Sequence, residues 1–132
     1  MECVFCKIIN KELPAYIIYE DENTMAFLDI NPVSKGHLLV VPKRHYSKLS
    51  EMPIEELEKF FKGLQNVIKI VENKLSNHYN IVVNQGEKAG QVINHLHFHI
   101  IPRYGYEQIF IWNTHKLTED EAKEVLKKLG KI

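Results

Sequence analysis

The chain has 132 residues, of which 45% are hydrophobic and 26% charged, as in an ordinary globular protein long enough to bury a core. Its 17 basic residues balance 17 acidic ones, so no overall positive field indicates a nucleic-acid binder. The sequence has no apolar run of the roughly 20 residues that a membrane span needs and no signal-peptide pattern. We therefore expect a cytoplasmic protein that binds neither nucleic acid nor membrane.

The first third of the chain predicts a short helix, a β-hairpin and a central strand. The helix carries apolar residues at helical spacing, and two β-rich runs flank a turn made of Asp21, Glu22 and Asn23. A strongly apolar run follows Gly36, as expected of a strand inside a sheet. The predicted ranges are 4–10 for the helix, 15–19 and 25–28 for the hairpin, and 37–41 for the central strand.

A long amphipathic helix, two more strands and a final helix are expected in the rest of the chain. Pro53 suits the first turn of the long helix, while Thr118 and Glu121 form a capping box for the last helix, which Gly130 ends. The pattern predicts an α+β fold in one domain, residues 1–132, with an antiparallel sheet of about five strands. The strands are expected at 79–83 and 95–101, and the apolar face of the long helix comprises Leu57, Phe61, Leu64, Ile68, Val71 and Leu75.

Residues 95–101 carry the strongest chemical signal, because histidine alternates there with apolar residues. The period of two is that of a β-strand, so the histidines share one face and the apolar residues enter the core. Neighbouring histidines, about 6.6 Å apart, could share a zinc ion, whereas the outer two are about 13 Å apart and must divide their duties. A merely solvent-exposed polar face is the plain alternative. The two faces are His95, His97 and His99 on one side, and Leu96, Phe98 and Ile100 on the other.

A polar loop, residues 84–91, lies directly before this strand. Gly86 and Gly90 would allow its backbone N–H groups to turn toward a phosphate, and Asn84 and Gln91 flank it with neutral donors. A surface turn can have the same composition, but the position before three histidines favours anion binding.

The run His-x-His-x-His followed by two apolar residues resembles the signature of the histidine triad superfamily of nucleotide hydrolases and transferases. The likeness is greatest to the small nucleotide-binding branch with phosphoramidase-type members, in its bacterial and archaeal zinc-containing form. It covers a motif-bearing core at residues 3–104 and, more loosely, a variable tail at 105–132. The segments that agree in order and spacing are 3–9, 26–30, 36–43 and 84–91.

The resemblance implies a nucleotidyl hydrolase or transferase that acts on the α-phosphate of purine nucleoside 5′-phosphoryl compounds such as adenosine 5′-phosphoramidate. His97 matches the nucleophile that forms a nucleotidyl-histidine intermediate, and His99 matches the residue that contacts the phosphate. Water would then release AMP or GMP, with His37 in the catalytic hydrogen-bond network. The implied nucleotide-binding residues are Phe5, Ile8, Phe27, Asp29, Ile30, Asn84, Gln91, Val92, His97 and His99.

Several of these implied roles have plain alternatives. Asp29 matches the group that holds the ribose hydroxyls, but the apolar positions could serve the core as well as a base-binding slot. His37 could be a structural histidine at the start of a strand. Val92 stands where the family often has Ser or Thr, so the hydroxyl contact to the phosphate is absent and only a backbone N–H remains.

Cys3 and Cys6 form a C-x-x-C motif, which in a reducing compartment favours metal binding or redox chemistry over a structural disulfide. Two thiols are an incomplete zinc site, and two reduced cysteines without metal are the alternative. The resemblance supplies His45 and His95 as the other ligands. It implies one structural Zn²⁺ per chain, with no open position for catalysis.

Other functions remain open at this point. The ending Ile101-Pro102-Arg103 resembles the dinucleoside polyphosphate hydrolase branch. A purine nucleotide-binding regulatory protein with weak residual activity and a zinc-binding structural module are alternatives from other classes. The resemblance also implies a homodimer, formed through the long helix and the edge of the histidine strand, and a tail in which Trp112 and His115 tune substrate selection.

Overall fold

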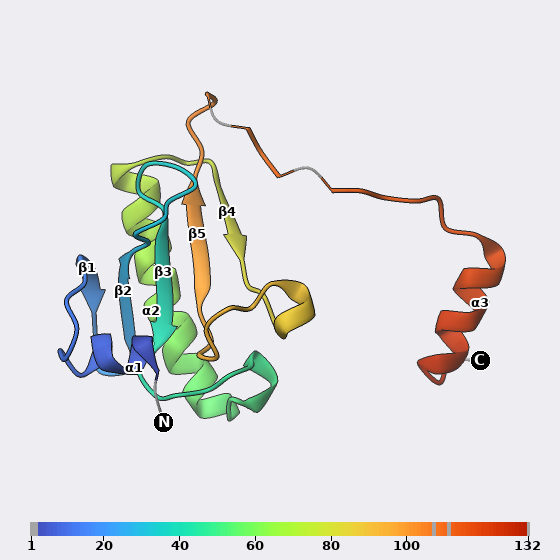
Figure 1. The fold of residues 1–132 in the computed structure, drawn as a ribbon, viewed down its shortest axis with the longest axis horizontal. Coiled ribbons are helices and arrows are strands. Elements are labelled where there is room, and N and C mark those ends of the chain that lie inside the picture. Colours follow the sequence, from blue (N-terminus) through green and yellow to red (C-terminus); the bar gives the residue numbers. More distant parts are fainter. Residues whose placement is uncertain (1–2, 107, 111, 132) are drawn as a thin grey trace.

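The computed structural model describes residues 3–106, 108–110 and 112–131. Its centre is a five-stranded sheet in which every neighbouring pair is antiparallel (Figure 1). The predicted α+β fold with an antiparallel sheet of about five strands is therefore confirmed. In spatial order the strands are β1 (Ile17–Glu20), β2 (Thr24–Leu28), β3 (Leu38–Pro42), β5 (Phe98–Pro102) and β4 (Tyr79–Val82).

Helices cover both faces of this sheet near its centre. The long helix α2 (Ile54–Lys74) lies across one face, and the short helix α1 (Val4–Ile9) packs on the other. A third helix, α3 (Glu119–Lys128), stands apart from the sheet at the end of an extended tail (Figure 1). Two 3-10 turns, Leu49–Glu51 and Glu87–Ala89, occupy the connecting loops. Among the described residues, none of the helices combines the length and the hydropathy that a membrane span requires.

Two hydrophobic clusters form, one on each face of the sheet, because β2 and β3 are buried on both sides. The cluster under α2 contains Leu96, Phe98 and Ile100, and the cluster under α1 contains Cys3, Phe5, Ile8 and Phe27. Since the apolar residues of the histidine segment pack toward α2, the three histidines face the side of α1. The predicted division of the two faces is confirmed.

The histidine strand is shorter than predicted, because β5 begins at Phe98. Its pairing with β3 ends at Val40 opposite Phe98, and β3 itself ends at Pro42, which has no N–H to donate to a ladder. The backbone N–H of Leu96 instead donates to the Tyr46 carbonyl at 2.6 Å. His95 and His97 therefore lie in an irregular lead-in, which keeps their alternation while allowing their backbone groups other partners.

The predicted apolar face of α2 is only partly right. Leu64 and Val71 are buried as expected, but Phe61 and Leu75 are 40% and 43% exposed, and the core side of the helix is completed by Phe60 and Val67. The predicted apolar face therefore contains both residues of the core side and residues that line a groove on the surface of the helix. The groove residues are Ile54, Leu57, Glu58, Phe61, Lys62, Leu64, Gln65 and Ile68.

Candidate active site and metal centre

His97 is held so that one particular ring nitrogen is free. Its Nδ1 lies 2.7 Å from the carbonyl oxygen of His95, and a carbonyl can only accept, so Nδ1 carries the proton and donates it. The ring is 9% exposed and packs edge-on against Phe5, with ring centroids 5.1 Å apart. In the neutral form of this fixed imidazole the lone pair is therefore on Nε2, which is the arrangement a nucleophile needs.

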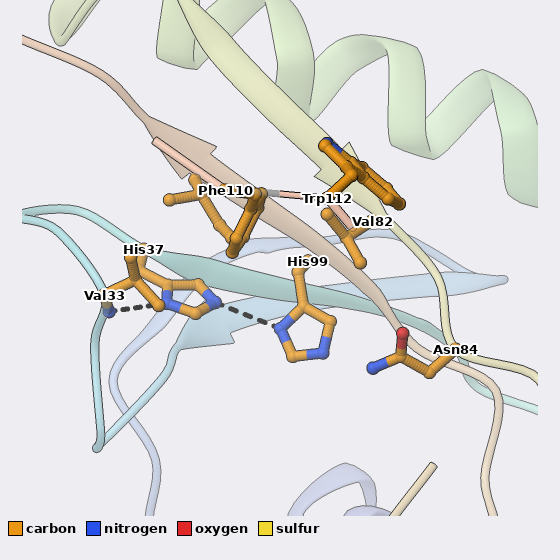
Figure 2. Close-up of a pocket in the computed structure, with 8 residues that line it drawn as sticks. Val33, His37, Val82, Asn84, His99, Phe110 and Trp112 are labelled. Atoms are coloured by element: carbon orange, nitrogen blue, oxygen red, sulfur yellow. Dashed lines mark hydrogen bonds between the residues drawn. The ribbon is translucent and has the colours of Figure 1, made fainter. Parts of the chain in front are cut away.

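A chain of hydrogen bonds sets the tautomer of His99. The backbone N–H of Val33 donates to Nδ1 of His37 at 2.9 Å, which leaves the proton of neutral His37 on Nε2 (Figure 2). That Nε2 lies 3.0 Å from Nδ1 of His99, so it donates to His99 and the proton of neutral His99 must be on its own Nε2. His99 thus presents an N–H donor at its free edge, toward which the Asn84 amide points in Figure 2.

Burial keeps both of these rings neutral. It lowers the pKa of His99 to about 4, with further lowering by His97 and His37 and a smaller opposing effect of Asp29. Burial also lowers the pKa of His37, although the Asp29 carboxylate, 3.5 Å from His37 Nε2, opposes that shift. At neutral pH both histidines therefore keep the single-proton tautomers that their partners assign.

This depressed pKa predicts a pH-dependent contribution to stability. Between pH 6.5 and about 4 the unfolded chain protonates His99 while the folded chain does not, so the free energy of unfolding should fall as the pH falls through this window. Urea unfolding at pH 5 and pH 7 should therefore show a smaller loss on acidification in His99→Asn than in the wild type. His78→Asn, which removes an exposed histidine, is the matched control and should keep the wild-type loss. Equal losses in all three proteins would contradict the prediction.

One cavity is lined by two of the histidines, and a second contains Phe5, whose ring packs against His97. One, of about 400 Å³, is lined by His37, His99 and Asn84 together with Val33, Val82, Ile101, Phe110 and Trp112 (Figure 2). The other, of about 350 Å³, gathers all five residues predicted for the nucleoside, namely Phe5, Ile8, Phe27, Asp29 and Ile30. Phe5, Ile8 and Phe27 are at the same time core residues, so their role in a base-binding slot stays a prediction, whereas Ile30 is 81% exposed at the rim.

Gln91 and Val92 line neither of these two cavities. The Gln91 amide accepts from the Gly86 N–H at 2.8 Å and donates to the Ser47 carbonyl at 2.9 Å, so it holds the loop in place. Val92 is 92% exposed, and both line a separate depression with Gly86 and Gly90. Of the predicted loop residues, Asn84 alone lines a cavity with His99.

Some residues of the site left no signal in the sequence. The Val33 N–H and the carbonyl of Pro42 act through the backbone, which every residue type carries. Val82 and Ile101 share a face with His99, because Val82 pairs directly with His99 and Ile101 lies two residues further along β5. The strand alternation alone could have indicated them.

His115, predicted for the tail, instead binds Glu121 at 2.9 Å beside α3.

Cys3, Cys6, His45 and His95 converge in one cluster, with a ligand atom of each within 4.8 Å of the others. Cys3 Sγ lies 3.5 Å from His95 Nδ1, Cys6 Sγ lies 3.3 Å from His45 Nδ1, and the two Nδ1 atoms are 3.1 Å apart. Tetrahedral zinc with bonds of about 2.0–2.3 Å places its ligand atoms roughly 3.3–3.8 Å from one another. The donor set and its spacing therefore fit a four-coordinate zinc ion.

The orientation of His95 fits the same use. Its Nε2 donates to the Pro42 carbonyl at 2.9 Å, so the Nδ1 lone pair faces the two sulfur atoms. Burial lowers the pKa of His95 to about 4, which keeps the ring neutral. For the Cys6 thiol, burial and the adjacent Cys3 raise the pKa to about 11, and a bound cation would supply the charge that stabilises the thiolate.

His95 joins the two sites physically. Its ring belongs to the cysteine–histidine cluster, and its carbonyl oxygen accepts the hydrogen bond that orients His97. A displacement of the cluster that moves the His95 backbone would therefore also move the His97 imidazole.

Comparison with known proteins links this geometry to a family. Residues 10–106 match the family model described as the HIT domain. A Methanocaldococcus jannaschii protein described as an uncharacterized HIT-like protein is 57% identical over 102 residues, 77% of this chain and 79% of that protein. The Schizosaccharomyces pombe adenosine 5′-monophosphoramidase hnt1 is 36% identical over 125 residues, 93% of this chain and 92% of the relative. A solved structure of a HIT family member from Bacillus subtilis matches with a TM-score of 0.87 and 36% identity, covering 99% and 96% of the two chains.

Proposed function

The chain belongs to the HIT domain family, and from this premise we propose that it is a nucleotide hydrolase that cleaves purine nucleoside 5′-phosphoryl compounds of the adenosine 5′-phosphoramidate type. The observation that carries the proposal is the free Nε2 of His97 next to the N–H edge of His99. Relatives described as adenosine 5′-monophosphoramidases support the choice of substrate. The released product is the nucleoside monophosphate.

In the first step His97 Nε2 attacks the α-phosphorus. A bond from phosphorus to this nitrogen forms, the bond to the leaving amine breaks, and the amine takes up a proton from solvent as it departs. His99 donates its Nε2–H to the phosphoryl group, where negative charge is concentrated, and the Asn84 amide can donate from the same side. Because His37 fixes the His99 tautomer, this donor needs no rearrangement at the moment of reaction.

In the second step water attacks the nucleotidyl-histidine. A bond from the water oxygen to phosphorus forms and a proton of the water passes to solvent, while the phosphorus–nitrogen bond breaks, His97 recovers its lone pair, and AMP or GMP is released. The hydrogen bond from Nδ1 to the His95 carbonyl stabilises the positive charge that His97 carries while it is bonded to phosphorus. The same hydrogen bond thus prepares the nucleophile and supports the leaving group of the second step.

The nucleoside is assigned to the cavity beside α1. Phe5, Ile8 and Phe27 offer apolar walls for the purine, and Ile30 closes the rim. Asp29 already accepts from the Asn31 N–H through Oδ1 at 2.8 Å, which fixes the carboxylate for the ribose hydroxyls. In the loop the Gln91 backbone N–H already donates to the Gly86 carbonyl at 3.1 Å, so the Val92 N–H is the backbone donor left for the phosphate, while the Gln91 side chain holds the loop.

Zinc and a second copy of the chain complete the proposal. Cys3, Cys6, His45 and His95 would hold one structural Zn²⁺, whose chemistry is to bind two thiolates and fix α1 beside the sheet. The groove on α2, with Ile54, Leu57 and Phe61, would be covered in a homodimer. Sedimentation velocity on the wild-type protein measures the second point directly, and a monomer at micromolar concentration would exclude it.

An activity panel tests the proposed reaction. We expect kcat/KM to be highest for adenosine 5′-phosphoramidate and lower for diadenosine tetraphosphate. The 2′,3′-dideoxy form of the phosphoramidate should lose roughly tenfold or more, because Asp29 then lacks its partners. A preference for the tetraphosphate would favour a dinucleoside polyphosphate hydrolase. Background turnover of every substrate, despite tight AMP binding, would indicate a regulatory nucleotide-binding protein.

A further inference from the structure

Arg103 is a buried arginine at the end of the active-site face of β5. It follows Ile101 by two residues, so its side chain continues the row of His99 and Ile101, and it is 7% exposed. Its Nε donates to Oδ1 of Asn80 at 2.8 Å. Asn80 lies on the neighbouring strand β4, where it pairs with Ile101 of β5. No carboxylate among the described residues forms an ion pair with this guanidinium, so its burial has to be compensated by other contacts.

The tail returns to this side chain after the turn at Gly105. Arg103 Nη1 donates to the Gln108 carbonyl at 3.3 Å, and the guanidinium carbon lies 4.9 Å from the centre of the Phe110 ring. Planar guanidinium groups bind aromatic faces and carbonyl oxygens together in a way that the point charge of lysine cannot. One buried side chain therefore fastens two residues of the otherwise exposed tail to the sheet.

The fastened segment forms a wall of the cavity at His99. Phe110 and Trp112 line that cavity opposite His37 and Asn84 (Figure 2). Trp112 is 79% exposed, so burial of its own ring does not hold it at this position. Since the nucleoside is assigned to the cavity beside α1, this second cavity is left for the group on the other side of the phosphorus.

We propose that Arg103 is a specificity-determining positioning residue, which holds Phe110 and thereby Trp112 at the wall of the leaving-group cavity. Arg103 touches neither the phosphorus nor the nucleophile and acts through the tail. The inference rests on the proposed hydrolase function. It implies that leaving groups large enough to reach the wall depend on Arg103, whereas ammonia does not.

Two substrates that differ only in the leaving amine test this role. We expect Arg103→Lys to lower kcat/KM for the N-(2-phenylethyl) phosphoramidate of AMP by roughly tenfold, mainly through KM, because the contact of the arginine with the ring is lost. Turnover of adenosine 5′-phosphoramidate should stay within about twofold of the wild type. Arg44→Lys, at an exposed arginine that pairs with Glu56, is the matched control and should leave both substrates unchanged. Equal losses on both substrates in Arg103→Lys would overturn the proposal, since a general structural defect has no such preference.

A second measurement does not depend on activity. Trp112 is the single tryptophan of the chain, so its fluorescence anisotropy reports the mobility of the tail. Anisotropy should fall in Arg103→Lys and equally in Phe110→Leu, whose half-exposed ring can be removed without disturbing the core. Wild-type anisotropy in both variants would refute the anchoring. If no substrate is turned over but the anisotropy falls, the proposed function fails while the anchoring of the tail stands.

Discussion

Replacing His97 with alanine is expected to lower kcat for adenosine 5′-phosphoramidate by roughly 10⁴-fold or more, because the reaction loses its nucleophile. Binding of AMP should change little, since the nucleoside contacts come from the cavity beside α1 and His99 remains as a donor. Steady-state kinetics and a calorimetric titration with AMP measure the two quantities. His78→Ala, at an exposed histidine outside both cavities, is the control and should keep wild-type values of both.

The covalent step can be tested independently of the mutation. Rapid quenching without acid, after mixing with substrate labelled at the α-phosphate, should trap label on the wild-type protein and none on His97→Ala. A variant that keeps most of the wild-type activity would show that another group attacks the phosphorus. Loss of activity in the variant, with no label on the wild type, would instead make His97 a general base for direct attack by water.

The sequence alone could predict which histidines share a face, but not what each ring does. Alternation with Leu96, Phe98 and Ile100 is enough to place the histidines opposite the core, because strand periodicity is a local property. The roles depend instead on partners distant in the chain. His99 receives its tautomer from His37, 62 residues away, and His95 is fixed by the Pro42 carbonyl.

Where the structure differs from what the sequence pattern suggests, distant partners are again the reason. Gln91 has the right chemistry for a phosphate, yet Ser47, 44 residues away, and Gly86 occupy its amide. Phe61 fits the apolar period of α2, but the sheet meets the helix on the side of Phe60 and Val67. The sequence presents Arg103 only as the end of a short motif, because its contacts with Asn80, Gln108 and Phe110 form only in the folded chain. Periodicity describes a face of an element, and only packing shows what that face meets.

Removal of zinc is expected to lower the free energy of unfolding, and to lower the activity as a consequence. The proposed ion would join Cys3, which precedes α1, and Cys6 within it to His45 and His95, and α1 supplies Phe5 and Ile8 to one of the two hydrophobic clusters. Losing it should lower the free energy of unfolding by several kcal/mol, as for other structural zinc sites. Urea unfolding of the wild type before and after chelation measures this loss, and elemental analysis should find one zinc per chain before treatment.

The double variant Cys3→Ser, Cys6→Ser supplies the matched control, because it should have the stability of the chelated wild type and lose nothing more on chelation. A further loss would mean that the chelator acts somewhere other than this cluster. If elemental analysis finds no metal and the double variant is as stable as the wild type, the cysteines are simply two reduced thiols.

The effect on catalysis should follow through the His95 backbone. A displaced cluster shifts the carbonyl that holds His97 Nδ1, and a misplacement of about 1 Å at a nucleophile can cost roughly 100-fold in rate. We therefore expect kcat of the chelated protein to fall under conditions where circular dichroism still shows it folded, while KM changes less. Four protein ligands would leave a bound ion no position for substrate or water. Activity that disappears on chelation with the free energy of unfolding unchanged would contradict this assignment and give the metal a direct part in the reaction.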